Sequence, residues 1–188
     1  NKALVLAPVV LLSLTACGKL SNEKAQERIN SYSLSEVADK YASVDIKSDV
    51  KINKRTGVFA EGGLMSSIVD LLISALDQNE EAAPVEDGFF TTDAVDVASL
   101  TEEGDVNIEY YAYKKNGLKV VASSKVDSDS DGLKSTGSGK TTAFVLDDGR
   151  MEKGEGSMKM SMSGSSLGVS LEGSLDFSYK ISYKWNAK

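Results

Sequence analysis

One short segment carries carboxylates at alternate positions, a pattern found in calcium-binding loops. Asp127, Asp129 and Asp131 are separated by single serines and followed by Gly132. In a calcium loop, alternate carboxylates converge on one cation, and the glycine permits the tight turn between them. An EF-hand also requires a bidentate glutamate at its twelfth position, which here is Ser138. An acidic, solvent-exposed β-turn is the commoner structure for such a segment. Calcium in a shorter loop is the alternative, and no other cofactor is predicted.

Other residue patterns argue against catalysis. The chain contains no histidine, which excludes Ser-His-Asp and Cys-His catalysis and removes the commonest zinc ligand. The segment 137–142 (GSGKTT) ends like a phosphate-binding loop, but Lys134 stands where that motif requires its first glycine. Residues 141–146 also favour a strand, whereas a helix should follow a phosphate-binding loop. We therefore predict that the protein is not an enzyme.

The only cysteine follows a segment with the features of a secretory signal. Lys2 is the only charge before Cys17, and residues 3–12 are apolar. An apolar run of this length is too short to span a membrane, which takes roughly 20 residues. The sequence Leu14-Thr15-Ala16-Cys17 resembles the lipobox of bacterial lipoproteins, in which an aliphatic residue and two small residues precede the cysteine. The resemblance implies that residues 1–16 are a signal peptide and that a diacylglycerol is attached to the Cys17 thiol.

The same resemblance implies a location in the cell envelope. Lipid on Cys17 would anchor the mature protein in a membrane, because two or three acyl chains hold a protein where one would not. In a Gram-negative cell, glycine rather than aspartate at position 18 favours the outer membrane. In a Gram-positive cell, the anchor leaves the protein on the outer face of the plasma membrane. With Cys17 acylated, no thiol remains for a disulfide, so the domain must fold by its core alone.

The charge balance is acidic. The chain has 21 basic and 28 acidic residues, a net charge of −7. An acidic surface without a basic patch argues against nucleic acid as a partner and against electrostatic attraction to anionic lipid. Besides the membrane reached through the N-terminal lipid, the expected partner is an unidentified envelope protein or an apolar ligand.

The N-terminal part of the mature chain is predicted to be a tether. Residues 17–33 are mostly polar and are expected to form a lipidated N-terminus and tether, followed by one α+β domain over 34–188. Ser33 and Glu36 have the spacing of a capping box, so a short helix is expected to follow and to end near Tyr41.

Periodicity then predicts one strand and one buried helix. Residues 44–52 alternate between apolar and polar, as in a half-buried strand. Residues 64–77 are apolar at helical spacing over most of a helix surface, with a single polar stripe. We expect this helix to be buried on several sides.

The remainder of the chain is dominated by β patterns. Residues 107–113 and 118–126 are predicted to pair through a type I′ turn at Asn116-Gly117. Residues 158–162 and 167–185 alternate strictly, which predicts a long hairpin with one apolar and one polar face. A strand of that length exceeds the diameter of a compact domain, so the sheet must coil or bend near Gly173.

The expected fold is therefore α+β. It consists of a strongly curved antiparallel sheet, in the extreme a half-barrel, packed on one buried helix, with a short N-terminal helix. The sequence favours a non-enzymatic interaction or structural module. The alternative is a carrier or sensor of a lipid or another apolar ligand, because this architecture resembles lipid-handling envelope lipoproteins of the LolB and LppX types. A carrier would need an apolar cavity of roughly several hundred Å³ between helix and sheet.

Overall fold

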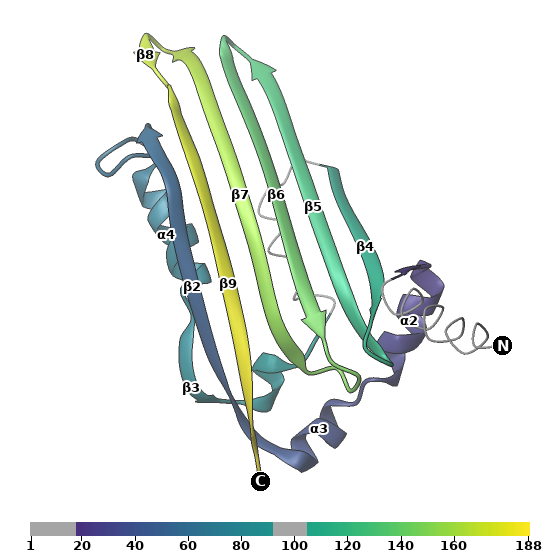
Figure 1. Cartoon of the computed structure of the whole chain (residues 1–188). Coiled ribbons are helices and arrows are strands. Elements are labelled where there is room, and N and C mark those ends of the chain that lie inside the picture. Colours follow the sequence, from purple (N-terminus) through teal and green to yellow (C-terminus); the bar gives the residue numbers. More distant parts are fainter. Residues whose placement is uncertain (1–17, 92–104) are drawn as a thin grey trace, which may run out of the picture.

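The computed structural model describes residues 18–91 and 105–188, and the predicted signal peptide (1–16) and Cys17 lie outside the described residues. Long antiparallel strands form one open sheet (Figure 1). In chain order the elements are β1 (Lys19–Leu20), α2 (Asn22–Ser31), α3 (Leu34–Lys40), β2 (Tyr41–Gly57), α4 (Ser66–Leu76), β3 (Asn79–Ala83), the 3₁₀ turn η1 (Val85–Gly88), β4 (Asp105–Tyr113), β5 (Gly117–Ser130), β6 (Leu133–Val145), β7 (Met151–Ser166), β8 (Val169–Ser170) and β9 (Gly173–Ala187). The strand order is β1-β4-β5-β6-β7-β9-β2-β3, with β8 paired to β7. The predicted antiparallel sheet is confirmed.

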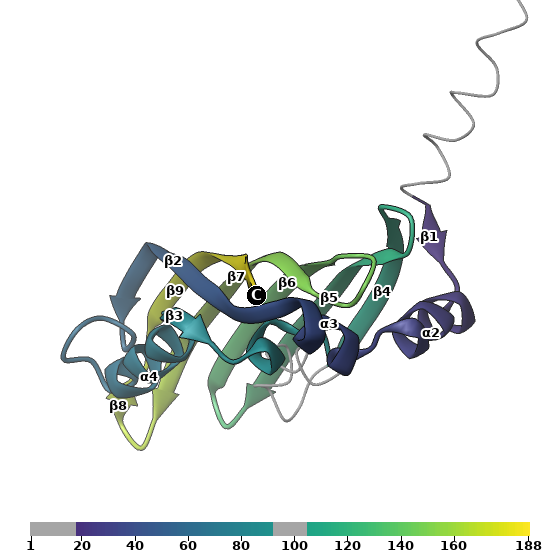
Figure 2. The same ribbon diagram turned by 90° about the horizontal axis from the view of Figure 1, so that it is seen from below.

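The sheet has two different faces. Figure 2 shows α2, α3 and α4 on one side, which we call the inner face, while the described elements leave the other side, the outer face, bare of helices. Side chains alternate between the two faces along each strand. The inner face carries the buried residues, such as Leu118 and Val120 on β5 and Leu175 and Phe177 on β9. No helix in the described part of the chain is long and apolar enough to cross a membrane.

The pairing of β7 with β9 follows the sequence pattern closely. Residues 153–162 of β7 pair with residues 173–182 of β9, with Met158 opposite Phe177 and Met160 opposite Leu175. The strand predicted over 167–185 is interrupted at Leu171-Glu172, between β8 and β9. The long run therefore breaks just before Gly173.

Helix α4 is confirmed within two residues of its predicted bounds, but it is not buried on several sides. Val69 and Leu76 are buried, and they belong to a core cluster with Leu175 and Phe177 of β9. Ile68 and Leu71 on another side of the helix are exposed by 51 and 71%, and Leu64, just before the helix, is exposed by 73%. The sheet covers one side of α4, and no described element covers the other.

The predicted tether is absent over the part of it that the structure describes. Residues 18–33 form β1 and α2 and pack against the sheet instead of extending from it. Ala25 of α2 is 1% exposed in a core cluster with Phe90, Leu118 and Val120. Arg28 fixes the helix further, because its Nη1 donates to the Gly117 carbonyl at 2.6 Å. Residues 18–33 are therefore part of the folded domain.

Candidate functional site

The outer face of the five central strands is a broad array of lysine and hydroxyl side chains. The register aligns β5, β6, β7, β9 and β2 into rows, so that, for example, Lys125, Ser138, Lys159 and Asp176 lie side by side. We call the 25 outward positions of these rows the lysine face. They are Lys47, Asp49, Lys51, Lys54, Thr56, Lys119, Val121, Ser123, Lys125, Asp127, Thr136, Ser138, Lys140, Thr142, Phe144, Lys153, Glu155, Ser157, Lys159, Ser161, Ser174, Asp176, Ser178, Lys180 and Ser182.

The lysine face is basic although the protein is acidic. Its nine lysines outnumber its four carboxylates, which gives it a net charge of +5. The whole chain carries −7, so the remaining residues carry −12. The prediction of a surface without a basic patch is therefore wrong. The net charge of the whole chain does not show how the charges are divided between the two faces of the sheet.

Most of these lysines have no carboxylate partner. Among the described residues, the one ion pair within the face joins Lys159 Nζ and Asp176 Oδ2 at 3.9 Å, a distance at which an exposed pair contributes little. Lys153 Nζ lies 4.6 Å from the centre of the Phe144 ring, and Lys119 Nζ lies 5.8 Å from it. The ammonium groups are therefore available to bind an anion.

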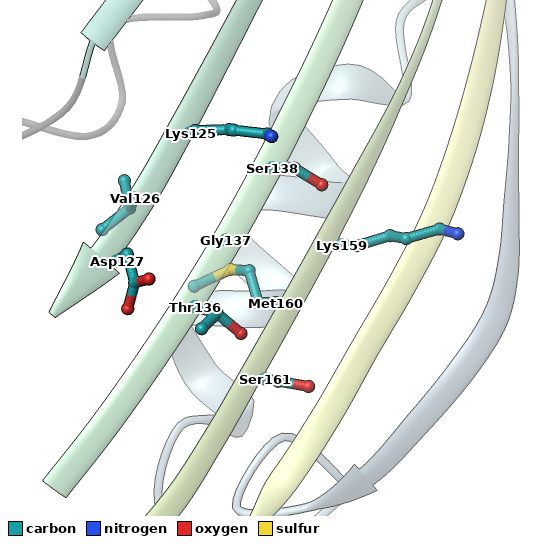
Figure 3. Close-up of a pocket in the computed structure, with 9 residues that line it drawn as sticks. All are labelled: Lys125, Val126, Asp127, Thr136, Gly137, Ser138, Lys159, Met160 and Ser161. Atoms are coloured by element: carbon teal, nitrogen blue, oxygen red, sulfur yellow. The ribbon is translucent and has the colours of Figure 1, made fainter. Parts of the chain in front are cut away.

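Two shallow depressions lie on this face. The first, of about 290 Å³, is shown in Figure 3. There Lys125 extends from β5 across β6 towards Ser138, and Lys159 extends from β7 across β9. The second, of about 360 Å³, is lined by Lys119, Lys140 and Lys180 together with the hydroxyl groups of Thr142, Ser157 and Ser178 and with Glu155. Ammonium and hydroxyl groups are hydrogen-bond donors suited to phosphate, sulfate or carboxylate oxygens.

The chain segment that follows Cys17 is attached to the edge of the same face. Lys19 is paired with Tyr111 of β4, and both side chains point outward because the neighbouring Ala112 is buried. Lys19 Nζ lies 3.0 Å from Glu109 Oε1, and the Tyr111 hydroxyl donates to Glu109 Oε2 at 2.7 Å. The hydrogen bonds from Tyr111 and Lys19 lower the pKa of Glu109 to about 2. The Gly18 carbonyl also accepts from Ala112 N at 3.0 Å, so the residue before β1 is held to β4 as well.

The acidic segment 127–132 forms part of a β-hairpin and not a loop whose carboxylates converge on one ion. Asp127 and Asp129 occupy outward positions of β5, opposite Thr136 and Lys134 of β6. Asp131 and Gly132 form the two-residue turn, with φ values of 53° and 80°, as a type I′ turn requires. Alternate residues of a strand are about 6.6 Å apart. Across the described residues, no three His, Cys, Asp or Glu side chains are grouped closely enough to hold a metal ion.

Calcium is therefore expected to leave the stability of the protein unchanged. Calcium binds six to eight oxygens at about 2.3–2.6 Å, and carboxylates spread along one strand do not supply that shell. Thermal melting with calcium and with a chelator should give the same midpoint. A higher midpoint with calcium that disappears in an Asp127→Asn/Asp129→Asn/Asp131→Asn variant would contradict this and restore the calcium loop.

The apolar hollow on the inner face is small. It is lined by residues of β5, β6 and β7 together with Phe59, and it has a volume of about 90 Å³. Its apolar lining comes from Phe59, Val126 and the three alternating methionines of β7, Met158, Met160 and Met162. This volume is well below the roughly 300–1,000 Å³ of pockets that enclose a drug-sized ligand.

Sequence reasoning found the polar positions of single strands but not the site that they form together. The alternation of Lys47 and Lys51 on β2, or of Lys159 and Ser161 on β7, is visible in the sequence. Which strands are neighbours is not visible, because β2 pairs with β9 across more than 100 residues of chain. No motif signals such a face.

Comparisons with protein-family models, with curated proteins and with solved structures found no match. The function is therefore inferred from the chain's own residues.

Proposed function

We propose that the protein is a lipid-anchored lipoprotein of the bacterial cell envelope and that its domain is a non-enzymatic interaction module. The anchor is proposed from the lipobox-like sequence Leu14–Cys17. Its location would be the outer membrane of a Gram-negative cell or the outer face of the plasma membrane of a Gram-positive cell. The observation that carries the interaction module is the lysine face, a basic and hydroxyl-rich surface that no described helix covers.

The core supports a non-catalytic role. Across the described ranges, Thr142 is the one polar residue that is buried, and no charged side chain is buried. General acid–base catalysis depends on titratable groups whose pKa values are shifted by burial and by neighbouring charges. The most strongly shifted carboxyl, that of Glu109, is partly exposed at the edge of the sheet, where it pairs with Lys19 of β1.

The apolar-ligand carrier is the less favoured function. The methionine-lined hollow of about 90 Å³ is smaller than the roughly 300–1,000 Å³ pockets that enclose drug-sized ligands. Methionines at these positions pack adaptably in a core without any ligand. An interaction module therefore explains the large lysine face, whereas a carrier would explain only the small apolar hollow.

Replacing Cys17 with serine is expected to abolish lipidation. The wild-type chain, expressed in bacteria with an alkyne-tagged palmitate analogue, should take up the label and fractionate with membranes. The Cys17→Ser variant should take up no label, because a hydroxyl does not replace the thiol that receives the diacylglycerol. Thr15→Ser is the matched control, since it keeps a small residue beside the cysteine, and it should be labelled like the wild type. Equal labelling of wild type and Cys17→Ser would refute the anchor.

A further inference from the structure

We propose that the lysine face lies against the anionic headgroups of the membrane that holds the lipid anchor. This inference rests on the proposed lipidation of Cys17 and names the partner of the lysine face. The partner is a bilayer surface rich in anionic phospholipid. The density of positive charge on the lysine face favours this partner. Five strands and five rows give an array of about 19 by 27 Å, and eight of its nine lysines are exposed.

The distribution of charge on the two sides of the molecule determines which side can approach such a membrane. Lysines close to an anionic leaflet are attracted within about one Debye length, roughly 8 Å at physiological salt. The helical side carries exposed carboxylates, among them Glu61, Asp77 and Glu80 beside α4. An anionic surface would repel that side. A protein of net charge −7 can therefore approach the membrane favourably with its lysine face.

The path of the chain brings the anchor to the same face. Lys19 comes two residues after Cys17, so their Cα atoms are at most about 7 Å apart. Lys19 is paired with Tyr111, which is paired with Lys119, and the same row continues through Phe144 to Lys153. Because β1 and α2 pack on the sheet, no slack tether separates the lipid from this row. The anchor would hold the edge of the lysine face at the membrane surface.

The chemistry of the two depressions fits phosphodiester headgroups. The second depression combines three ammonium groups, from Lys119, Lys140 and Lys180, with three hydroxyl groups. Phosphate oxygens accept from both kinds of donor. Lys125 and Lys159 flank the first depression in the same way (Figure 3). The face thus offers several separate positions for phosphate, as a surface of many headgroups requires.

The exposed apolar stripe of α4 is the competing membrane contact. Leu64, Ile68 and Leu71 are exposed, and α4 lies on the side of the sheet opposite the lysine face (Figure 2). Interfacial helices that bind membranes carry lysine or arginine on their polar side. On α4 the charged side chain is Asp70, which disfavours an anionic bilayer. The two surfaces make opposite predictions for mutagenesis.

The test uses the chain from residue 17 onwards with Cys17→Ser, so that the lipid contributes nothing to binding. We expect it to cosediment with vesicles of phosphatidylcholine and phosphatidylglycerol, but not with vesicles of phosphatidylcholine alone, and to be released by added salt. The variant Lys119→Gln/Lys140→Gln/Lys180→Gln should bind about tenfold more weakly or worse. The control Lys24→Gln/Lys40→Gln/Lys188→Gln removes the same charge from outside the face and should bind like its parent.

Four results would overturn the proposal. The first two are equal binding to both kinds of vesicle and equal losses of binding in the two lysine variants. The third is loss of binding in Leu64→Ser/Leu71→Ser while both lysine variants bind like their parent. The fourth is binding to a soluble acidic polysaccharide without binding to vesicles. Circular dichroism of each variant checks that it is folded. Palmitate labelling is measured separately in cells, so failure of the vesicle experiment would leave the proposed anchor standing.

Discussion

The substitution Phe177→Ala is expected to lower the free energy of unfolding by about 3–5 kcal/mol. Phe177 is 1% exposed and is among the largest fully buried side chains of the described residues. It lies on β9 in the cluster that joins the sheet to α4 and Phe59. Alanine would leave a cavity beneath the helix, because neighbours on rigid strands relax only partly. Urea denaturation followed by fluorescence of Trp185, the only tryptophan, measures the loss.

The matched control is Ile52→Ala. Ile52 lies opposite Phe177 on the neighbouring strand β2, but it is 43% exposed. Its truncation removes little buried surface and should cost about 1 kcal/mol or less. Similar losses for the two variants would show that the cluster at Phe177 is not the main core of this half of the sheet.

Elements determined by local sequence were predicted well. The N-cap half of the capping box predicted at Ser33 is present, since the Ser33 hydroxyl accepts from Glu36 N and α3 follows directly. The alternating methionines of β7 also lie where period two places them, on the inner face with Met158 and Met160 against the core. These features depend on neighbours within a few residues, which the sequence displays directly.

The turn at Asn116-Gly117 shows how tertiary contacts override a local signal. Instead of a two-residue turn, Lys114, Lys115 and Asn116 form a three-residue connection, and Gly117 pairs with Tyr113. Asn116 is drawn into contacts with distant segments, donating from its side chain to Ser31 Oγ at 2.9 Å. Gly117 is needed for a different reason, because a Cβ there would collide with the Val145 carbonyl. The dipeptide indicates a turn, but these contacts with other segments set its type.

Features that depend on strand order were not predictable. The apolar pattern of α4 is visible, but the pattern does not reveal that the sheet covers only the side of Val69 and leaves Leu71 exposed. Similarly, the charge of the lysine face arises only when β2, β9, β7, β6 and β5 lie side by side. Periodicity assigns a residue to a face of its own element, whereas the partner of that face is set by contacts far apart in sequence.

The substitution Ala25→Glu should release α2 from the sheet. Most of α2 is polar, which is why its sequence resembles a tether, yet Ala25 is buried among Phe90, Leu118 and Val120. A carboxylate at that position would be buried without a partner and should cost about 3 kcal/mol or more unless the helix detaches. Detachment is the expected outcome, because it returns the charge to water. Hydrogen exchange of residues 22–31 should then become fast, and the unfolding free energy should fall.

The control for this substitution is Gln26→Glu on the same helix. Gln26 is exposed, so the added charge should change stability by no more than about 0.5 kcal/mol and leave hydrogen exchange of α2 slow. If Ala25→Glu behaved like this control, α2 would contribute nothing to the core and residues 18–33 would be the flexible tether that their composition suggests. Whether α2 is docked also affects the proposed membrane contact. A docked α2 keeps Lys19 beside the lysine face. A detached α2 would let the domain move away from its anchor by the length of the tether.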